Sequence, residues 1–156
     1  VDNVPACGYI LGDEGGGAVL VKKLVSDYLK RMLPADLSEA FEKQYKLGLL
    51  DIIEKVYRQP LPNRFLASFA LFLGDHQSHP YVQEFLGKAF DEFFSRNIIH
   101  YDYKTYPVNI VGSVAYYFRD EVMASAARHG MKIGKIVRTP IEGLVAYHRN
   151  LMTQQE

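Results

Sequence analysis

Apolar residues recur at helical spacing directly after a glycine-rich stretch near the start of the chain. The pattern stops before Pro34, because proline cannot continue a helix. A single helix with one apolar face is therefore expected between the glycines and this proline. The residues that carry the spacing are Val21, Leu24, Val25, Tyr28 and Met32.

The next part of the chain alternates short apolar-periodic segments with turn signals, which predicts a helical subdomain of about residues 18–100. Asp36 and Glu39 have the spacing of a capping box, with Asp36 as the cap. Asn63 is expected to cap the apolar segment that follows it, and Pro80 suits the first turn of a helix. The expected helices are 36–45, 49–57, 65–73 and 80–94.

The last third of the chain has the pattern of a strand–helix–strand–helix unit, at about residues 106–152. Ser113 is expected to cap the helix between the strands, and Gly130 to end it. Strands joined through a helix run parallel, so these two should pair with each other, and either with Gly8–Leu11 or with strands outside this chain. The fold class is therefore α/β and helix-rich, with a short parallel sheet. The expected strands are 107–111 and 131–137, and the expected helices are 114–128 and 141–151.

Composition supports a single domain over residues 1–156. The chain is 48% hydrophobic, which at this length can supply a core. Its 18 basic and 18 acidic residues balance, so nucleic acid and anionic membranes are not expected as partners. No apolar run approaches the roughly 18 residues of a membrane-spanning helix. The single cysteine, Cys7, rules out an internal disulfide, favours the cytoplasm and is expected to be buried.

The run from Gly12 to Gly17 carries the clearest candidate chemistry. Three consecutive glycines let backbone approach a ligand closely, and Asp13 and Glu14 supply acceptors for hydroxyls or a metal-bound water. Because a helix follows, the loop should lie at a helix N-terminus, where unpaired N–H groups favour anions. A Walker A loop is excluded since Lys22 and Lys23 come too late and lack the hydroxyl, and a Rossmann fingerprint does not fit either.

Three segments together resemble one superfamily of ATPases. Residues 8–19 resemble the Gly-Asp-Glu-Gly-Ser-Gly element of the N-acetylglucosamine kinases and BadF/BadG-type ATPases, with Gly16 where serine is usual. Residues 108–115 look like the adenosine motif of the wider actin-like, sugar-kinase and Hsp70-like superfamily, with Ser113 replacing a second glycine. Residues 138–144 resemble its closing strand and turn before the last helix. The order and spacing of all three agree.

The resemblance implies the C-terminal lobe of a ribonuclease H-like, actin-like ATPase fold with a helical insertion. Both phosphate loops that precede the Gly-Asp-Glu element in the superfamily are missing, so the N-terminal lobe, with the general base and the main Mg²⁺ carboxylates, is expected outside this chain. The implied enzyme uses ATP and Mg²⁺ to phosphorylate an N-acetylglucosamine-like amino sugar, and is inactive without that lobe. A homodimer stays open.

The resemblance also assigns site residues. Those implied for the sugar and phosphate cleft are Gly12, Asp13, Glu14, Gly15, Gly16 and Gly17, and those implied for nucleotide binding are Gly112, Ser113 and Val114.

Two other functions remain open at this point. A BadF-type activator or regulatory ATPase would hydrolyse ATP to change the conformation of a partner. Such activators hold an iron–sulfur cluster with a pair of cysteines from each subunit, so Cys7 alone is too few. A non-catalytic helical interaction module would keep the loop without binding nucleotide or sugar.

The histidines and aromatic residues are expected to be structural. His76 and His79 lie close to Asp75 but lack the further ligand that a metal site needs, so no metal site is expected. His129 is expected as a cation at a helix C-terminus. The aromatics expected in the core are Phe85, Phe90, Phe93, Phe94, Tyr116, Tyr117 and Phe118.

Overall fold

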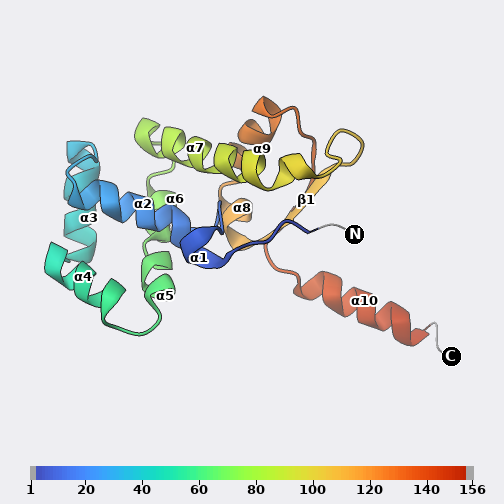
Figure 1. The fold of residues 1–156 in the computed structure, drawn as a ribbon, viewed down its shortest axis with the longest axis horizontal. Coiled ribbons are helices and arrows are strands. Elements are labelled where there is room, and N and C mark those ends of the chain that lie inside the picture. The colour runs from blue at the N-terminus through green and yellow to red at the C-terminus, as the bar shows by residue number, and fades with distance from the viewer. Residues whose placement is uncertain (1–2, 154–156) are drawn as a thin grey trace.

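The computed structural model of the chain describes residues 3–153, apart from the side chains of Tyr9, Asn150, Leu151 and Thr153. The outermost residues of the expected 1–156 domain, 1–2 and 154–156, lie outside this range. The first part of the chain is helical (Figure 1). Its elements are α1 (Gly8–Leu11), α2 (Gly17–Leu29), α3 (Ala35–Tyr45), α4 (Leu49–Tyr57), α5 (Pro62–Ala67), α6 (Ala70–Asp75), α7 (Pro80–Arg96) and the 3-10 turn η1 (Ile98–His100).

A small α/β unit follows the helical part. It comprises β1 (Val108–Val111), α8 (Ser113–Tyr117), α9 (Arg119–Arg128), β2 (Ile133–Val137) and α10 (Ile141–Thr153). The two strands pair in parallel, which confirms the prediction, and Val111 lies opposite Val137 at their carboxyl ends. In Figure 1, α3 and α4 lie at one end of the molecule and the strands at the other, while α10 extends away from the rest.

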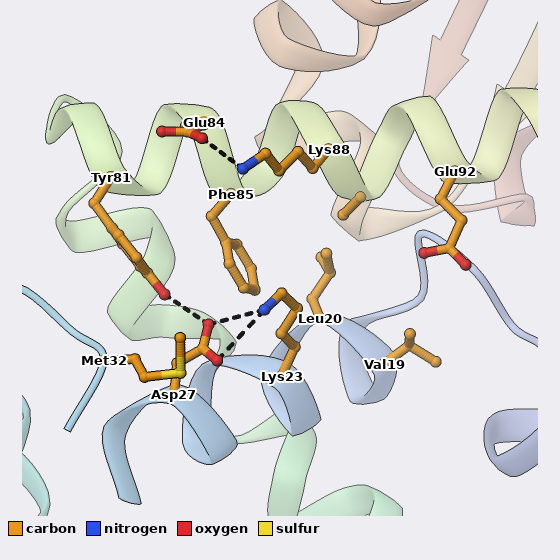
Figure 2. A pocket seen from close by; sticks show the side chains of 11 residues that line it. Val19, Leu20, Lys23, Asp27, Met32, Tyr81, Glu84, Phe85, Lys88 and Glu92 are labelled. Atoms are coloured by element: carbon orange, nitrogen blue, oxygen red, sulfur yellow. Dashed lines mark hydrogen bonds and ion pairs between the residues drawn. The ribbon is translucent and has the colours of Figure 1, made fainter. Parts of the chain in front are cut away.

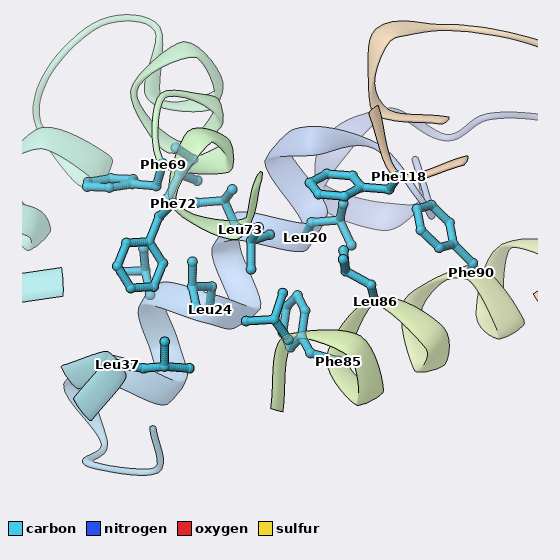
Figure 3. Close-up of a cluster of buried hydrophobic side chains, with 14 of the residues drawn as sticks. Leu20, Leu24, Leu37, Phe69, Phe72, Leu73, Phe85, Leu86, Phe90 and Phe118 are labelled. Atoms are coloured by element: carbon cyan, nitrogen blue, oxygen red, sulfur yellow. The ribbon is translucent and has the colours of Figure 1, made fainter. Parts of the chain in front are cut away.

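The core surrounds the buried face of α2. Its side chains Leu20, Val21, Leu24 and Val25 are at most 4% exposed. Figure 3 shows Leu20 and Leu24 between the aromatic and leucine side chains of α6 and α7. Apolar burial on both sides therefore holds α2 in place, as its helical periodicity predicted.

The predicted α2 extended too far. The helix ends at Leu29, and Arg31 has a left-handed φ of 57°, so the chain turns there. Met32, which was expected on the apolar face, is 65% exposed. The left-handed turn at Arg31 thus ends the helix before the apolar spacing ends at Met32.

Two predicted helix starts were wrong. Pro34, in extended backbone, precedes α3, so Asp36 lies inside the first turn and its carboxylate is 3.2 Å from His79 Nε2 instead of capping. Asn63 is inside α5, because Leu61 adopts a left-handed conformation and Pro62 takes the first helical position. The helix α4 has its predicted bounds, and the Asp51 carboxylate accepts a hydrogen bond from Gly48 N–H at its start.

Two expected long helices are each divided. The 65–73 segment breaks between α5 and α6, where the Ser68 hydroxyl donates to the Phe65 carbonyl, 2.6 Å away. The 114–128 segment breaks at Phe118, which is 3% exposed and leaves the helical conformation as it enters the core. Ser113 is the first residue of α8 and not its cap, a position that Gly112 takes.

The remaining segments follow the expectations more closely. The helix α7 begins at Pro80 as predicted and runs two residues past Phe94, and Gly130, with a φ of 67°, follows α9. Gly8–Leu11 forms α1 and not a strand. Within residues 3–153, no helix combines the length and apolar character needed to cross a bilayer.

Our first prediction tests the buried core. Phe72→Ala should lower the free energy of unfolding by about 3–5 kcal/mol, because it leaves a cavity at a fully buried position. The neighbouring Leu71 is 72% exposed, so Leu71→Ala should change stability by no more than about 0.5 kcal/mol. Urea denaturation of both variants measures the difference, and equal losses would contradict the described core.

Candidate functional site

Two segments far apart in the sequence line one cavity of about 350 Å³. One is the glycine loop, defined here as residues 12–17, and the other is the turn between β1 and α8. The cavity is closed by apolar side chains of α7 and α9. Its lining includes Asp13, Glu14, Gly15 and Gly16 from the loop, Gly112 from the turn, and Ser113 and Val114 from the start of α8. Most of the residues expected to bind ligand therefore lie together.

The two outer glycines of the loop do not line the cavity. A Cβ at Gly12 would be 2.3 Å from the Ala6 carbonyl oxygen, so this position packs against the chain before α1. A Cβ at Gly17 would lie 3.6 Å from Val114 Cγ2. Gly17 thus marks where the loop and the β1–α8 turn approach each other.

Backbone hydrogen bonds set the shape of the glycine loop. Asp13 N–H donates to the Ala6 carbonyl at 3.1 Å, and Gly16 N–H donates to the Asp13 carbonyl at 2.9 Å. Asp13 and Gly15 both have left-handed φ angles, 65° and 74°. The loop ends with Gly16 as the residue before α2, which places it at a helix N-terminus as predicted.

Gly16 leaves no room for a side chain in this loop. An added Cβ would lie 2.7 Å from the Asp13 carboxylate and 2.8 Å from the Asp13 carbonyl oxygen. The serine that is usual in the resembling family would therefore require a different loop shape.

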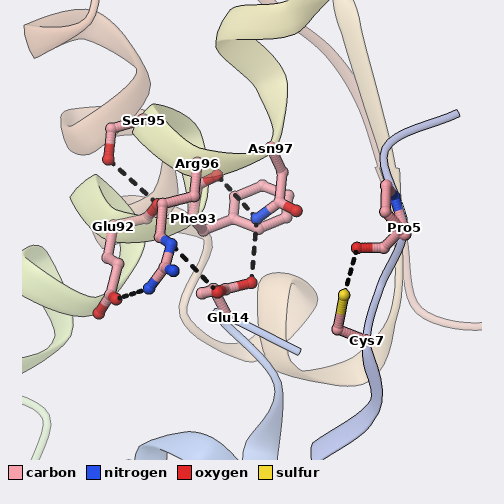
Figure 4. A network of polar contacts seen from close by, with 8 residues as sticks. All are labelled: Pro5, Cys7, Glu14, Glu92, Phe93, Ser95, Arg96 and Asn97. Atoms are coloured by element: carbon pink, nitrogen blue, oxygen red, sulfur yellow. Dashed lines mark hydrogen bonds and ion pairs between the residues drawn. The ribbon is translucent and has the colours of Figure 1, made fainter. Parts of the chain in front are cut away.

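Glu14 is fastened to the end of α7, as Figure 4 shows. Its carboxylate lies 3.3 Å from Arg96 Nε and accepts a hydrogen bond from Asn97 Nδ2, also at 3.3 Å. Only 13% of the Glu14 side chain is exposed. Its own backbone N–H, then Asn97 and Arg96, lower the pKa of Glu14 despite burial, which acts in the opposite direction.

Asp13 has the opposite environment. Asp13 is exposed and lines the cavity. Within the described part of the chain, its carboxylate forms no hydrogen bond or ion pair. Of the two adjacent acids, Asp13 is thus the one with free acceptor atoms for a ligand.

The β1–α8 turn supplies the other wall. Gly112 has a φ of 155°, which favours glycine, and its N–H donates to the Val137 carbonyl at 2.9 Å. This bond joins the carboxyl ends of the two parallel strands. Ligands commonly bind outside such strand ends in α/β sheets, and nothing lies within 4 Å of the position of a Gly112 Cβ.

A second cavity, of about 310 Å³, lies between α2 and α7 (Figure 2). The Asp27 carboxylate accepts a hydrogen bond from the Tyr81 hydroxyl at 2.8 Å and pairs with Lys23 at 3.0 Å. Burial, followed by this hydrogen bond to Asp27, raises the pKa of Tyr81. Because these polar groups satisfy one another, we assign them to the attachment of α7 to α2.

Two of the histidines have acidic partners. His79 pairs with Asp36, and His129, at the end of α9 as expected, lies 3.3 Å from Asp91. Among residues 3–153, no group of three or more His, Cys, Asp or Glu side chains is arranged to hold a metal ion.

The expectations for aromatic residues and for Cys7 were partly wrong. Phe85, Phe90, Phe94 and Phe118 are buried, and Phe93 packs partly buried against them. Tyr116 and Tyr117 are 42% and 55% exposed, because the short α8 turns them outward. Cys7 is exposed as well, and its Sγ lies 3.4 Å from the Pro5 carbonyl oxygen.

Sequence reasoning missed several residues of this site. Phe90 and Phe93 line the cavity, while Arg96 and Asn97 hold Glu14. Helical periodicity identified the phenylalanines as core residues. No spacing in the sequence connects position 14 with position 96.

The tight loop gives our second prediction. Gly16→Ala should displace Asp13 and lower stability by about 1–3 kcal/mol, because its Cβ meets backbone that cannot give way cheaply. Gly17→Ala is the matched control, since its Cβ would make an ordinary contact in the first turn of a helix. Amide chemical shifts of residues 12–17 should move widely in the first variant and little in the second. Similar shifts in both would contradict the loop geometry.

Comparison with known proteins shows what this chain is similar to. No protein-family model and no curated protein matches the chain. A solved structure from Porphyromonas gingivalis, described as a putative N-acetylglucosamine kinase, matches with 42% sequence identity and a TM-score of 0.92. The match covers 96% of this chain and 53% of that protein, so the chain spans about half of its length. This similarity confirms the resemblance to an N-acetylglucosamine kinase-like protein that the sequence motifs indicated.

Proposed function

We propose that the chain is the C-terminal lobe of an ATP-dependent kinase that phosphorylates an N-acetylglucosamine-like amino sugar. One observation supports this most directly: the glycine loop and the β1–α8 turn, which resemble two separate ligand motifs, line the same cavity. The similarity to a protein described as such a kinase adds to it.

The residues on the two walls suit different parts of the ligands. Gly112, Ser113 and Val114 would flank the adenosine, where the absence of a side chain at Gly112 leaves space for a flat ring. Asp13 would accept hydrogen bonds from sugar hydroxyls or from a metal-bound water. The loop N–H groups before α2 would face phosphate.

The donor set fits Mg²⁺ only in part. Asp13 is the one acidic side chain of the cavity that keeps free acceptor atoms within the described residues, whereas Mg²⁺ in kinases usually takes one or two carboxylates besides phosphate and water. When bound, Mg²⁺ would neutralise charge on the phosphates. The remaining carboxylates and the general base would come from the N-terminal lobe.

This division of labour makes the two lobes interdependent. Phosphoryl transfer depends on the alignment of the sugar hydroxyl with the phosphate, and one wall of a cleft cannot provide that alignment. ATP, the amino sugar and the N-terminal lobe are thus the proposed partners. A homodimer and a cytoplasmic location stay predictions.

A BadF-type activator or regulatory ATPase stays the alternative, although the exposed Cys7 alone is too few cysteines for the iron–sulfur cluster of such activators. The activity of such an ATPase would form ADP without a phosphorylated sugar. Measuring both ADP and sugar phosphate separates the two functions.

Our third prediction tests the kinase directly. The 156-residue chain should form no measurable ADP with ATP, Mg²⁺ and a panel of amino sugars, and a form joined to its N-terminal lobe should form ADP together with a sugar phosphate. ADP formation without a phosphorylated sugar would favour the ATPase. Turnover by the chain alone would refute the division of the site between lobes.

The fourth prediction concerns the adenosine wall. In the joined form, Gly112→Val should weaken ATP binding by more than about tenfold, because a branched side chain would enter the cavity and restrict φ. Binding of the sugar should change less. Isothermal titration with a non-hydrolysable ATP analogue measures the effect.

Gly130→Val is the matched control for backbone strain. Gly130 also has a positive φ and open space around it, but it does not line the cavity. It should lower stability and leave ATP affinity unchanged. Equal ATP affinity in both folded variants would remove Gly112 from the site.

A further inference from the structure

The second half of the glycine loop rests on the last turn of α7. A Cβ at Gly15 would lie 3.4 Å from the Phe93 side chain, and Glu14 contacts both Arg96 and Asn97. Figure 4 shows the Glu14 carboxylate directed toward these two side chains. The glycine loop is therefore held in place by α7, a helix that lies outside the sequence motifs singled out above.

The Glu14 carboxylate lies where a negative charge is energetically unfavourable. Asn97 follows directly after α7, so Glu14 lies at the C-terminal end of a helix, where the helix dipole disfavours negative charge. Glu14 is also largely buried, which adds a cost of desolvation. Arg96 is the cation at this position, with its Nε 3.3 Å from the carboxylate, and it offsets these effects together with the Glu14 backbone N–H and Asn97.

Arg96 also contacts a second, more exposed acid. Its Nη1 donates to the Glu92 carboxylate, one turn earlier on α7, at 2.9 Å. Among the described residues, Glu92 forms no hydrogen bond or ion pair with the glycine loop, and its side chain is 53% exposed. Glu92 therefore contacts Arg96, as Glu14 does, but lies away from the loop. The pair Glu92–Arg96 thus provides an internal control for the pair Glu14–Arg96.

We propose that Arg96 is a positioning residue which, through Glu14, fixes the glycine loop on the cavity wall and thereby sets where Asp13 meets its ligand. The effect on the loop is a property of this chain. The effect on sugar binding rests on the proposed kinase function. Losing the pair releases residues 13–15 while α2, whose apolar face is buried, stays in place.

Hydrogen–deuterium exchange on the 156-residue chain tests the first part without any ligand. In Arg96→Met and Glu14→Gln, amides of residues 12–17 should exchange about three- to tenfold faster, because the contact is partly exposed and its loss opens the loop only locally. The double variant should be no faster than either single variant. Arg96→Lys should recover part of the protection, and Glu92→Gln should leave the loop unchanged.

Two results would overturn this part. One is unchanged exchange of residues 12–17 in both Arg96→Met and Glu14→Gln. The other is additive acceleration in the double variant, which would mean that the two residues act separately. Amides in the middle of α2 serve as a reference, because a general loss of stability would accelerate them as well.

Kinetics of the form joined to the N-terminal lobe test the second part. Arg96→Met should raise the KM for the amino sugar about tenfold and the KM for ATP by a smaller factor, because Gly112 and its neighbours would hold the adenosine on the other wall. Glu92→Gln should leave both constants unchanged. An unchanged sugar KM despite a loosened loop would refute the role of Arg96 in ligand positioning.

The two arms separate the inference from the proposed function. If the joined wild-type form lacks kinase activity, the proposed function fails while the exchange experiment still decides whether Arg96 holds the loop. If that form is active and the loop exchange does not respond to Arg96, the inference fails and the kinase stands.

Discussion

The burial of one face of α2 is the constraint on which the rest of the structure depends. Its four apolar side chains from Leu20 to Val25 are almost inaccessible to water, and each contributes roughly 1.5–3 kcal/mol by burial. A shift of this helix would expose them together. Because the glycine loop leads directly into α2, this helix fixes the last residues of the loop. Only the first residues of the loop are left to be positioned by other contacts.

The helix α7 connects this rigid helix to the cavity wall. At its start, Tyr81 donates a hydrogen bond to the buried Asp27 of α2. In its middle, Asp91 accepts hydrogen bonds from Ser125 and Arg128 of α9, and these lower the pKa of Asp91 although burial works to raise it. The last turn of α7 is therefore fixed relative to both sides of the cavity, which makes it a suitable support for the glycine loop.

Two adjacent acids of the loop consequently have different environments. The left-handed backbone of Asp13 separates the directions of the two carboxylates, so Glu14 reaches α7 while Asp13 stays at the cavity. An acid that is paired with a cation and largely desolvated is suited to holding structure, whereas an exposed and unpaired one is suited to contacting a ligand. Asp13 and Glu14, which are adjacent in the sequence motif, are thus suited to separate roles.

The amino-acid sequence by itself determined the features that depend on neighbouring residues. Helix α4, the parallel pairing of β1 with β2 and the position of the glycine loop before α2 follow from apolar spacing, glycine and proline, which act over a few residues. Tertiary structure alone decided the break at Phe118, the exposure of Cys7 and the contact of Glu14 with Arg96. These depend on which distant segments pack together, and burial and ion pairing across long separations leave no periodic trace in the sequence.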